Sequence, residues 1–394
     1  MLMRGIFSII FLSVIIPLRA AYIMIPMDET QANHLKAYGI AYWILTKEVN
    51  VDWMLNYKGG SFMVKHLQAF ENECVIRGVS YQVISDAEAN DVLNLIGSPS
   101  SNMDVMKLEK FPKIAVYSPK SKQPWDDAVT LVLTYAEIPY DVIFDDEILG
   151  EKLPEYDWLH LHHEDFTGQY GKFYRSFHHF PWYQQQQREA EQSAKKHGFS
   201  KVSQLKLATV KTIKSYVASG GFLFAMCSAT DTYDIALAAE GLDIIETIYD
   251  GDPANPRAQS LLDFDKTFAF ENFVLERDEM VYEYSNIDNQ PNSRGLVEQN
   301  DFFSLFQFSA KWDPIPTMLT QNHTQIVHGF MGQTTGFKSN LIKGDVIVMG
   351  ETGSLNEAKY IHGVMGRGFW TFYGGHDPED YQHFVNEPPT DLNL

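Results

Sequence analysis

Apolar stretches of strand length alternate with amphipathic helical segments over much of the chain. After Pro112, short apolar stretches occur at residues 113–117, 140–144, 156–161 and 222–226. Between them, segments 128–136 and 202–218 repeat apolar residues with the spacing of one buried helix face. Strands and helices that alternate over short links predict an α/β fold. We expect an open, mostly parallel sheet with helices on both faces.

The first part of the chain has a pattern of its own. Residues 22–27 and 79–84 are strand-like, and residues 28–47 and 86–96 are helix-like. The segment 97–102, which contains Ser, Pro and Asn, is the best linker candidate. The sequence therefore predicts a small N-terminal α/β unit at residues 21–111, followed by a larger domain at residues 112–394.

The larger domain changes character in its second half. Residues 243–344 are rich in turn residues and carry short β-like segments at 267–276 and 302–308. Strand-like patterns then resume at 346–349, 360–364 and 369–373. We expect an irregular β-rich insertion at about 243–344 within one α/β domain.

The first twenty residues have the composition of a signal peptide. Arg4 supplies a positive charge, residues 5–16 are almost wholly apolar, and Ala20 or Ala21 suits a small-residue cleavage site. The apolar run is shorter than the roughly 20 residues that span a bilayer. We expect residues 1–20 to be cleaved, leaving an exported, periplasmic or extracellular protein without a transmembrane anchor.

Charge narrows the range of partners. The chain has 31 Lys and Arg against 51 Asp and Glu, a formal net charge of −20. A field of this sign repels phosphate backbones and anionic membrane surfaces. We therefore expect no nucleic-acid partner.

Cys227 is the first candidate for chemistry. It follows the apolar strand 222–226 and precedes a predicted helix that starts at Ser228. Functional groups collect at the carboxyl ends of parallel strands, and a helix N-terminus favours the thiolate. Cys227 is a candidate nucleophile in a strand–nucleophile–helix turn; the alternative is a small buried cysteine that only packs. We expect Cys227 and Cys74 to remain separate thiols rather than a disulfide.

A second candidate segment follows the strand 369–373. It holds His376 and the carboxylates of Asp377, Glu379 and Asp380. A thiolate nucleophile needs an imidazole, and the imidazole needs a carboxylate that orients it. In this hypothesis His376 moves the proton, Glu379 or Asp377 orients it, and the backbone N–H of Ser228 helps to hold the oxyanion. The alternative is a capped turn with an exposed histidine.

A third cluster lies after the strand 156–161. His160, His162, His163, Glu164 and Asp165 fall within six residues. They are predicted to line the same cleft as Cys227, with a structural hydrogen-bonding role as the alternative. We expect no cofactor, but zinc binding by these histidines stays an open alternative, although their spacing does not match common zinc motifs.

The order of these elements resembles a known superfamily. The segment from Lys113, with Cys227 in the turn and His376 near the end, resembles the class I glutamine amidotransferase-like superfamily, and the Gly-His-x-Pro-Glu-Asp ending is similar to its trehalose-utilisation-type branch. This resemblance implies a flavodoxin-like fold. The active members' elbow reads Gly-x-Cys-x-Gly, whereas Ala225 and Ala229 flank the cysteine here.

The chain also resembles a family of exported bacterial proteins often labelled asparagine synthetase B. The resemblance rests on the strings at 25–28, 33–39 and 159–165. Asparagine synthesis of that type needs an N-terminal nucleophilic cysteine and a Ser-Gly-Gly-x-Asp-Ser loop for ATP, which this sequence lacks. ATP-dependent asparagine synthesis is therefore not expected.

Two functions remain from the sequence. The first is an exported Cys-dependent hydrolase of an amide or ester, acting on a small-molecule, peptide or glycan substrate. The second is a non-catalytic binding or assembly protein of the cell envelope that keeps the same fold and has an envelope protein as its partner.

Overall fold

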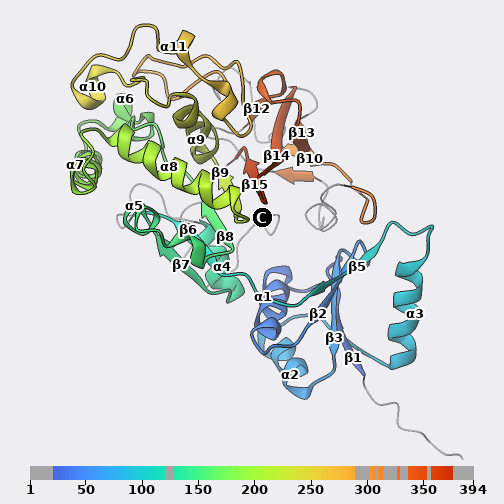
Figure 1. The fold of residues 1–394 in the computed structure, drawn as a ribbon. Helices are drawn as coiled ribbons and strands as arrows, with labels where there is room; N and C mark the ends of the chain where they lie inside the picture. The colour runs from blue at the N-terminus through green and yellow to red at the C-terminus, as the bar shows by residue number, and fades with distance from the viewer. Residues whose placement is uncertain are drawn as a thin grey trace, which may run out of the picture.

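The computed structural model describes residues 21–119, 128–288, 302–307, 309–313, 326–328, 336–352 and 356–375. The predicted signal peptide at 1–20 lies outside these ranges. Within them, no helix combines the length and the hydrophobicity that a membrane crossing requires. The described elements form two β-sheets, each flanked by helices (Figure 1).

The first sheet is built from residues 22–108 and is wholly antiparallel, in the order β4-β1-β3-β2-β5. Its strands are β1 (Tyr22–Ile25), β2 (Val51–Leu55), β3 (Ser61–Lys65), β4 (Gln82–Ile84) and β5 (Asp104–Leu108). Helices α1 (His34–Leu45) and α2 (Gln68–Arg77) pack their apolar side chains on one face. Helix α3 (Asp86–Gly97) packs on the other face.

Two of these helices begin where a side chain caps them. The Asn33 side chain accepts the N–H of Lys36, so α1 begins at His34 and not at residue 28 as predicted. Residues before it turn instead, because the carboxylate of Asp28 accepts the N–H of Thr30. Helix α3 begins with a complete capping box between Ser85 and Glu88, which agrees with its predicted start.

The second sheet contains ten strands in the described part of the chain, and its first half is parallel. Five parallel strands lie in the order β7-β6-β8-β9-β15. They are β6 (Ile114–Tyr117), β7 (Tyr140–Ile143), β8 (Trp158–Leu161), β9 (Phe222–Met226) and β15 (Gly368–Tyr373). All five match predicted strands, and β9 matches at both ends because its apolar run is bounded by Gly220-Gly221 and the turn at Cys227.

The other half of this sheet is antiparallel. Strand β14 (Glu357–Met365) pairs with β15 and with β13 (Ile347–Thr352), and β13 pairs with β10 (Phe302–Leu305). Strand β11 (Ile326–His328) pairs with β10, and β12 (Phe337–Lys338) pairs with β14. The α/β class is confirmed, but the expectation of a mostly parallel sheet is wrong, because strands from and after the insertion extend the sheet in antiparallel fashion.

Helices cover both faces of the parallel half. Helix α4 (Ala128–Ala136) packs Leu133 against Ile114 and Val116 on one face. The opposite face contacts α5 (Asp145–Leu149), α8 (Val202–Ala218) and α9 (Ser228–Ala238). Shorter helical pieces and α7 lie around them (Figure 1). These are η1 (Leu153–Glu155), η2 (Tyr170–Lys172), α6 (Tyr174–Phe177), α7 (Pro181–Lys196), α10 (Thr247–Asp250), α11 (Ala258–Leu261), η3 (Phe264–Lys266) and η5 (Ser339–Leu341).

Helices α1 and α4 join the two sheets. Lys36 and Glu137 form an ion pair of 2.7 Å, and Asn33 donates a 2.6 Å hydrogen bond to the hydroxyl of Tyr135. Gly39 makes the close approach feasible, because a Cβ at this position would lie 1.8 Å from the carbonyl oxygen of Ala136.

Candidate active site

The carboxyl ends of three neighbouring parallel strands meet beside Cys227. In the register, Leu161 of β8 pairs with Ala225 of β9, and Met226 of β9 pairs with Tyr373 of β15. The strands β8, β9 and β15 therefore end at almost the same level. In an open α/β sheet this edge is where ligands bind.

Cys227 occupies the turn between β9 and α9 in a strained backbone conformation. Its φ is 51° and its ψ is −140°, a combination that side chains with a Cβ rarely adopt. The turn matches the sharp strand-to-helix geometry of a nucleophile elbow. Ala225 and Ala229 are fully buried on either side, so this elbow forms with alanine where the resembling superfamily has glycine.

Hydrogen bonds fix the start of α9 behind the thiol. The carbonyl oxygen of Cys227 accepts the N–H of Thr230 at 3.1 Å and its hydroxyl at 2.7 Å. Ser228 is the first residue of the helix and is buried. The N–H groups of a first helical turn point out of the helix without an intrahelical acceptor, so the Ser228 N–H is suited to hold an oxyanion beside Cys227.

The loop after β8 is tied to α9 by one side chain. The hydroxyl oxygen of Thr232 accepts the N–H of Phe166 at 3.2 Å, and its one proton lies between the carbonyl oxygens of Ser228 at 2.5 Å and Glu164 at 3.1 Å. The carboxylate of Glu164 accepts the N–H of His162 at 2.9 Å. The loop therefore lies next to α9, the helix that begins at Ser228 directly after Cys227.

Asp165 organises the next part of that loop. Its carboxylate accepts the N–H of Thr167 at 2.7 Å, of Gly168 at 3.2 Å and of Gly171 at 3.1 Å. Gly168 and Gly171 have φ values of +90° and +73°, which only glycine adopts without strain. The Asp165 carboxylate therefore stabilises the conformation of this loop through three hydrogen bonds.

The three histidines follow one another from β8 into the loop after it. His160 lies within β8, buried, with its ring stacked on Phe224 of β9 at 5.3 Å between centroids. The rings of His160 and His162 are 6.5 Å apart, and those of His162 and His163 are 4.6 Å apart. His160 therefore faces a sheet surface below the strand end, whereas His162 and His163 follow the strand toward the loop.

The predicted proton-transfer residues fall outside the described part of the chain. Strand β15 ends at Tyr373 and the described range ends at Gly375, so His376, Asp377 and Glu379 lie beyond it. The roles proposed for these three residues stay predictions. Gly374 donates to the carbonyl oxygen of Lys359 at 2.6 Å, which brings the buried Lys359 of β14 to the end of β15.

Two tyrosines from the insertion lie near Cys227, and the sequence pattern did not single them out. Burial raises the pKa of Tyr282 and Tyr284, and the charge of Cys227 adds to the increase in both. The charges of Asp165 and Asp231 also raise the pKa of Tyr284. Tyr284 therefore lies among the loop after β8, the first turn of α9 and the thiol. Both tyrosines stay neutral at physiological pH and are hydrogen-bond donors near the elbow.

The two cysteines are not joined by a disulfide, as predicted. Cys74 is buried in α2 of the first sheet, and burial raises its pKa to about 12. Cys227 is 1% exposed, and it packs with Phe303 and Tyr373. The Cys227 thiol is therefore almost closed to solvent by the side chains around the elbow.

One group of side chains has the spacing of a metal site, but a lysine lies in it. Among the described residues, Asp243, Asp250 and Asp252 bring carboxylate oxygens within 4.8 Å of one another. The Lys201 ammonium lies 2.5, 2.9 and 2.6 Å from these three carboxylates. The ammonium already provides the positive charge that a metal ion would supply. No group found in the described residues includes the histidines at 160–163.

No family model and no curated protein matched the sequence. Among solved structures, the chain is similar to Gan42B, a GH42 beta-galactosidase from G. stearothermophilus, at 11% sequence identity and a TM-score of 0.29. This likeness covers 68% of this chain and 28% of the galactosidase chain. The chain is also similar to the cytoplasmic protein STM3548 from Salmonella typhimurium, at 10% identity and a TM-score of 0.31, over 67% of this chain and 87% of that chain. The chain thus spans less than a third of the length of the galactosidase. At these TM-scores neither likeness adds to the fold description.

Proposed function

We propose that this chain is an exported enzyme in which Cys227 attacks the carbonyl carbon of an amide or an ester. The observation that carries the proposal is the strained backbone of Cys227 at the β9–α9 turn. Strain of this kind costs about 1–3 kcal/mol. It persists only where the surrounding structure enforces it, and it is concentrated at active sites and ligand-binding sites. Export is inferred from the signal-like pattern of residues 1–20.

The scaffold in this proposal is flavodoxin-like, as in the class I glutamine amidotransferase-like superfamily that the sequence resembles. Numbered along the chain, the parallel strands β6, β7, β8, β9 and β15 lie in the order 2-1-3-4-5. That is the order of flavodoxin-like sheets, whose ligands bind at the carboxyl edge. Cys227 lies at this edge, which supports its assignment as the reacting group.

The proposed reaction has two steps. The Cys227 thiolate adds to the carbonyl carbon, the carbonyl oxygen becomes an oxyanion beside the Ser228 N–H, and the amine or alcohol leaves with a proton. Water then adds to the resulting thioester, and the acid leaves as the thiol re-forms. His376, oriented by Glu379 or Asp377, is proposed to carry the proton in both steps. No cofactor enters this scheme.

A second candidate function is binding without catalysis in the cell envelope. The nearly complete burial of Cys227 favours it, because a nucleophile must meet its substrate. In this case the elbow is retained as a packing feature, and an envelope protein is the partner.

Turnover separates these two functions. The purified protein is assayed for hydrolysis of activated esters and of a panel of amides, in parallel with Cys227→Ala and Cys74→Ala. The enzyme account expects hydrolysis by the wild type and by Cys74→Ala, and at least a hundredfold loss in Cys227→Ala with a melting temperature within a few degrees of the wild type. Equal rates in Cys227→Ala and the wild type, or complementation of a deletion strain by Cys227→Ala, would favour the binding function.

A further inference from the structure

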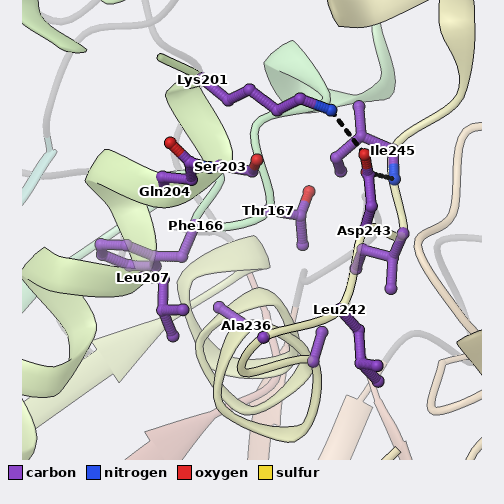
Figure 2. Close-up of a pocket in the computed structure, with 13 residues that line it drawn as sticks. Phe166, Thr167, Lys201, Ser203, Gln204, Leu207, Ala236, Leu242, Asp243 and Ile245 are labelled. Carbon is purple, nitrogen blue, oxygen red and sulfur yellow. Dashed lines mark hydrogen bonds and ion pairs between the residues drawn. The ribbon is translucent and has the colours of Figure 1, made fainter. Parts of the chain in front are cut away.

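A pocket of about 270 Å³ opens between the loop after β8, the start of α8 and the chain that follows α9. Phe166 and Thr167 reach it from the loop, and Ser203, Gln204 and Leu207 from α8. Figure 2 shows these side chains around the opening, with Ala236 of α9 below and Asp243 opposite. It is separate from the candidate active site, since Cys227 does not line it.

The pocket has an apolar floor and a polar rim. Leu207, Ala236 and Leu242 form an apolar floor (Figure 2). The rim above them is polar and includes Ser203 and the ion pair between Lys201 and Asp243. A ligand that fits must therefore present an apolar face to the floor and polar groups to the rim.

The charges at the rim argue against ionic ligands. Lys201 and Asp243 line the pocket, and the Lys201 ammonium also contacts the carboxylates of Asp250 and Asp252, which do not line it. The four groups sum to 1 − 3 = −2. An anion would be repelled by this excess and by the net charge of −20. A cation would have to displace the Lys201 ammonium, which is tethered to the same chain and therefore competes at a high effective concentration.

The rim retains hydrogen-bonding capacity for a neutral ligand. Asp243 Oδ1 accepts the N–H of Ile245 at 3.1 Å, and a carboxylate oxygen can accept a second bond. The side-chain oxygen of Gln204 accepts the hydroxyl of Ser200 at 3.0 Å, which fixes this amide at the rim. Hydroxyl groups, which both donate and accept, match a rim that combines a carboxylate, an amide and the hydroxyl of Ser203.

We infer that this pocket binds a neutral sugar of about monosaccharide size. A volume of 270 Å³ corresponds to roughly nine water molecules at about 30 Å³ each. This lies below the range of about 300–1,000 Å³ that holds drug-sized ligands. A pyranose presents a C–H face, which suits Leu207 and Leu242, and several hydroxyls, which suit the rim.

The pocket and the elbow share a structural element. The loop that supplies Phe166 and Thr167 is tied through Thr232 to α9, which begins directly after Cys227. A sugar in the pocket would therefore stabilise the loop beside the elbow. The inference itself does not depend on catalysis by Cys227.

Titration calorimetry with D-glucose, D-galactose and D-mannose tests the inference, with glucuronate and glucosamine as anionic and cationic counterparts. We expect saturable binding of at least one neutral sugar with a Kd on the order of 1 mM, as for ligands of this size. Glucuronate should bind at least tenfold more weakly, and glucosamine no more tightly than the neutral sugar. No saturation by any neutral sugar up to about 50 mM, or tighter binding of either charged probe, would overturn the inference.

Variants locate the binding. Ser203→Ala should weaken binding severalfold, whereas Ser215→Ala, on the exposed side of the same helix, should not. Ala236→Phe should fill the floor and weaken binding at least tenfold, with a thermal melt to confirm folding. Cys227→Ala should bind as the wild type does. Unchanged affinity in Ser203→Ala together with a loss in Cys227→Ala would place the sugar at the elbow instead and contradict the inference.

Discussion

The backbone N–H of Cys227 donates a hydrogen bond of 3.2 Å to the carbonyl oxygen of Tyr373. This bond continues the pairing of β9 with β15 one residue past the last paired residues, so the sheet itself holds the first half of the elbow. The second half is held by Thr230, which bonds the carbonyl oxygen of Cys227. Both peptide groups of Cys227 are thus fixed, and its positive φ is imposed by the fold.

Because Cys227 has a positive φ, glycine at this position should stabilise the protein relative to alanine. Cys227→Gly should be more stable than Cys227→Ala by about 1 kcal/mol, because alanine keeps the strain at φ 51° and glycine relieves it. Urea denaturation of the two variants measures the difference. At Cys74, inside α2, the order should reverse, with glycine less stable than alanine by about 1 kcal/mol. Greater stability of alanine at both positions would show that the elbow is not strained.

The two thiols should differ in reactivity. Burial raises the pKa of Cys74 to about 12, so Cys74 stays protonated at pH 6–8. Cys227 lies at the N-terminus of α9, and in the proposed function it reacts as a thiolate. Iodoacetamide should therefore modify Cys227 before Cys74 in the folded protein, as read by peptide mass mapping. Modification of Cys74 first, or equal inertness of both thiols, would argue against an activated thiol at the elbow.

The raised pKa of Asp234 predicts that the free energy of unfolding depends on pH. Asp234 lies fully buried in α9 and accepts the N–H groups of Phe268, Ala269 and Phe270 at 2.7, 2.7 and 2.9 Å. Burial outweighs these bonds and raises its pKa from 3.8 to about 6. The folded state thus binds the proton more tightly than the unfolded state. The stability contributed by this proton is complete below about pH 4 and is lost as the pH rises through about 6.

Asp234→Asn should remove this titration. Its free energy of unfolding, relative to that of the wild type, should increase by about 2 kcal/mol between pH 4 and pH 7, from a shift of about two pKa units. The constant offset between the two proteins reflects the lost hydrogen bonds and is not diagnostic. Parallel urea titrations of both proteins at several pH values measure the trend, and a difference that does not change with pH would contradict it.

Gly39 should be needed for the contact between the two sheets. Gly39→Ala places a Cβ at 1.8 Å from the Ala136 carbonyl oxygen, so α1 and α4 must separate, at a cost of about 1–3 kcal/mol. Gly97→Ala is the matched control, because a Cβ at the end of α3 meets no atom within 4 Å and should be neutral or slightly stabilising. Thermal melts compare the two. Equal melting temperatures would show that α1 and α4 are not held together tightly.

The sequence predicted the regular parts of the fold because their signals are local. The helix at 202–218 agrees at both ends with α8, since one apolar face and a Gly-Gly stop define it. The segment 267–276, predicted to be β-like, forms no strand but contains two isolated β-bridges, Phe270 with Ile342 and Leu275 with Ser285. Its first N–H groups bond the distant Asp234 carboxylate and not a neighbouring strand, a contact that no local pattern contains.

The candidate site was predictable only where it lies at strand ends. Cys227 follows an apolar strand and precedes a helix, so its position at the carboxyl edge follows from the α/β pattern. Tyr282 and Tyr284 reach the same place from the insertion, whose path depends on tertiary contacts such as the bonds from Lys172 to the carbonyl oxygens of Glu276 and Asp278. Aromatic residues in such a segment carry no periodic signal.

The central claim is that Cys227 forms a covalent acyl intermediate, and trapping that intermediate tests it most directly. The protein is incubated with an activated ester at neutral pH and quenched in acid, and its intact mass and peptide map are recorded. The account predicts an added acyl mass on the peptide that contains Cys227, lost on incubation with hydroxylamine and absent from Cys227→Ala. An unmodified Cys227, or the same adduct in Cys227→Ala, would contradict it.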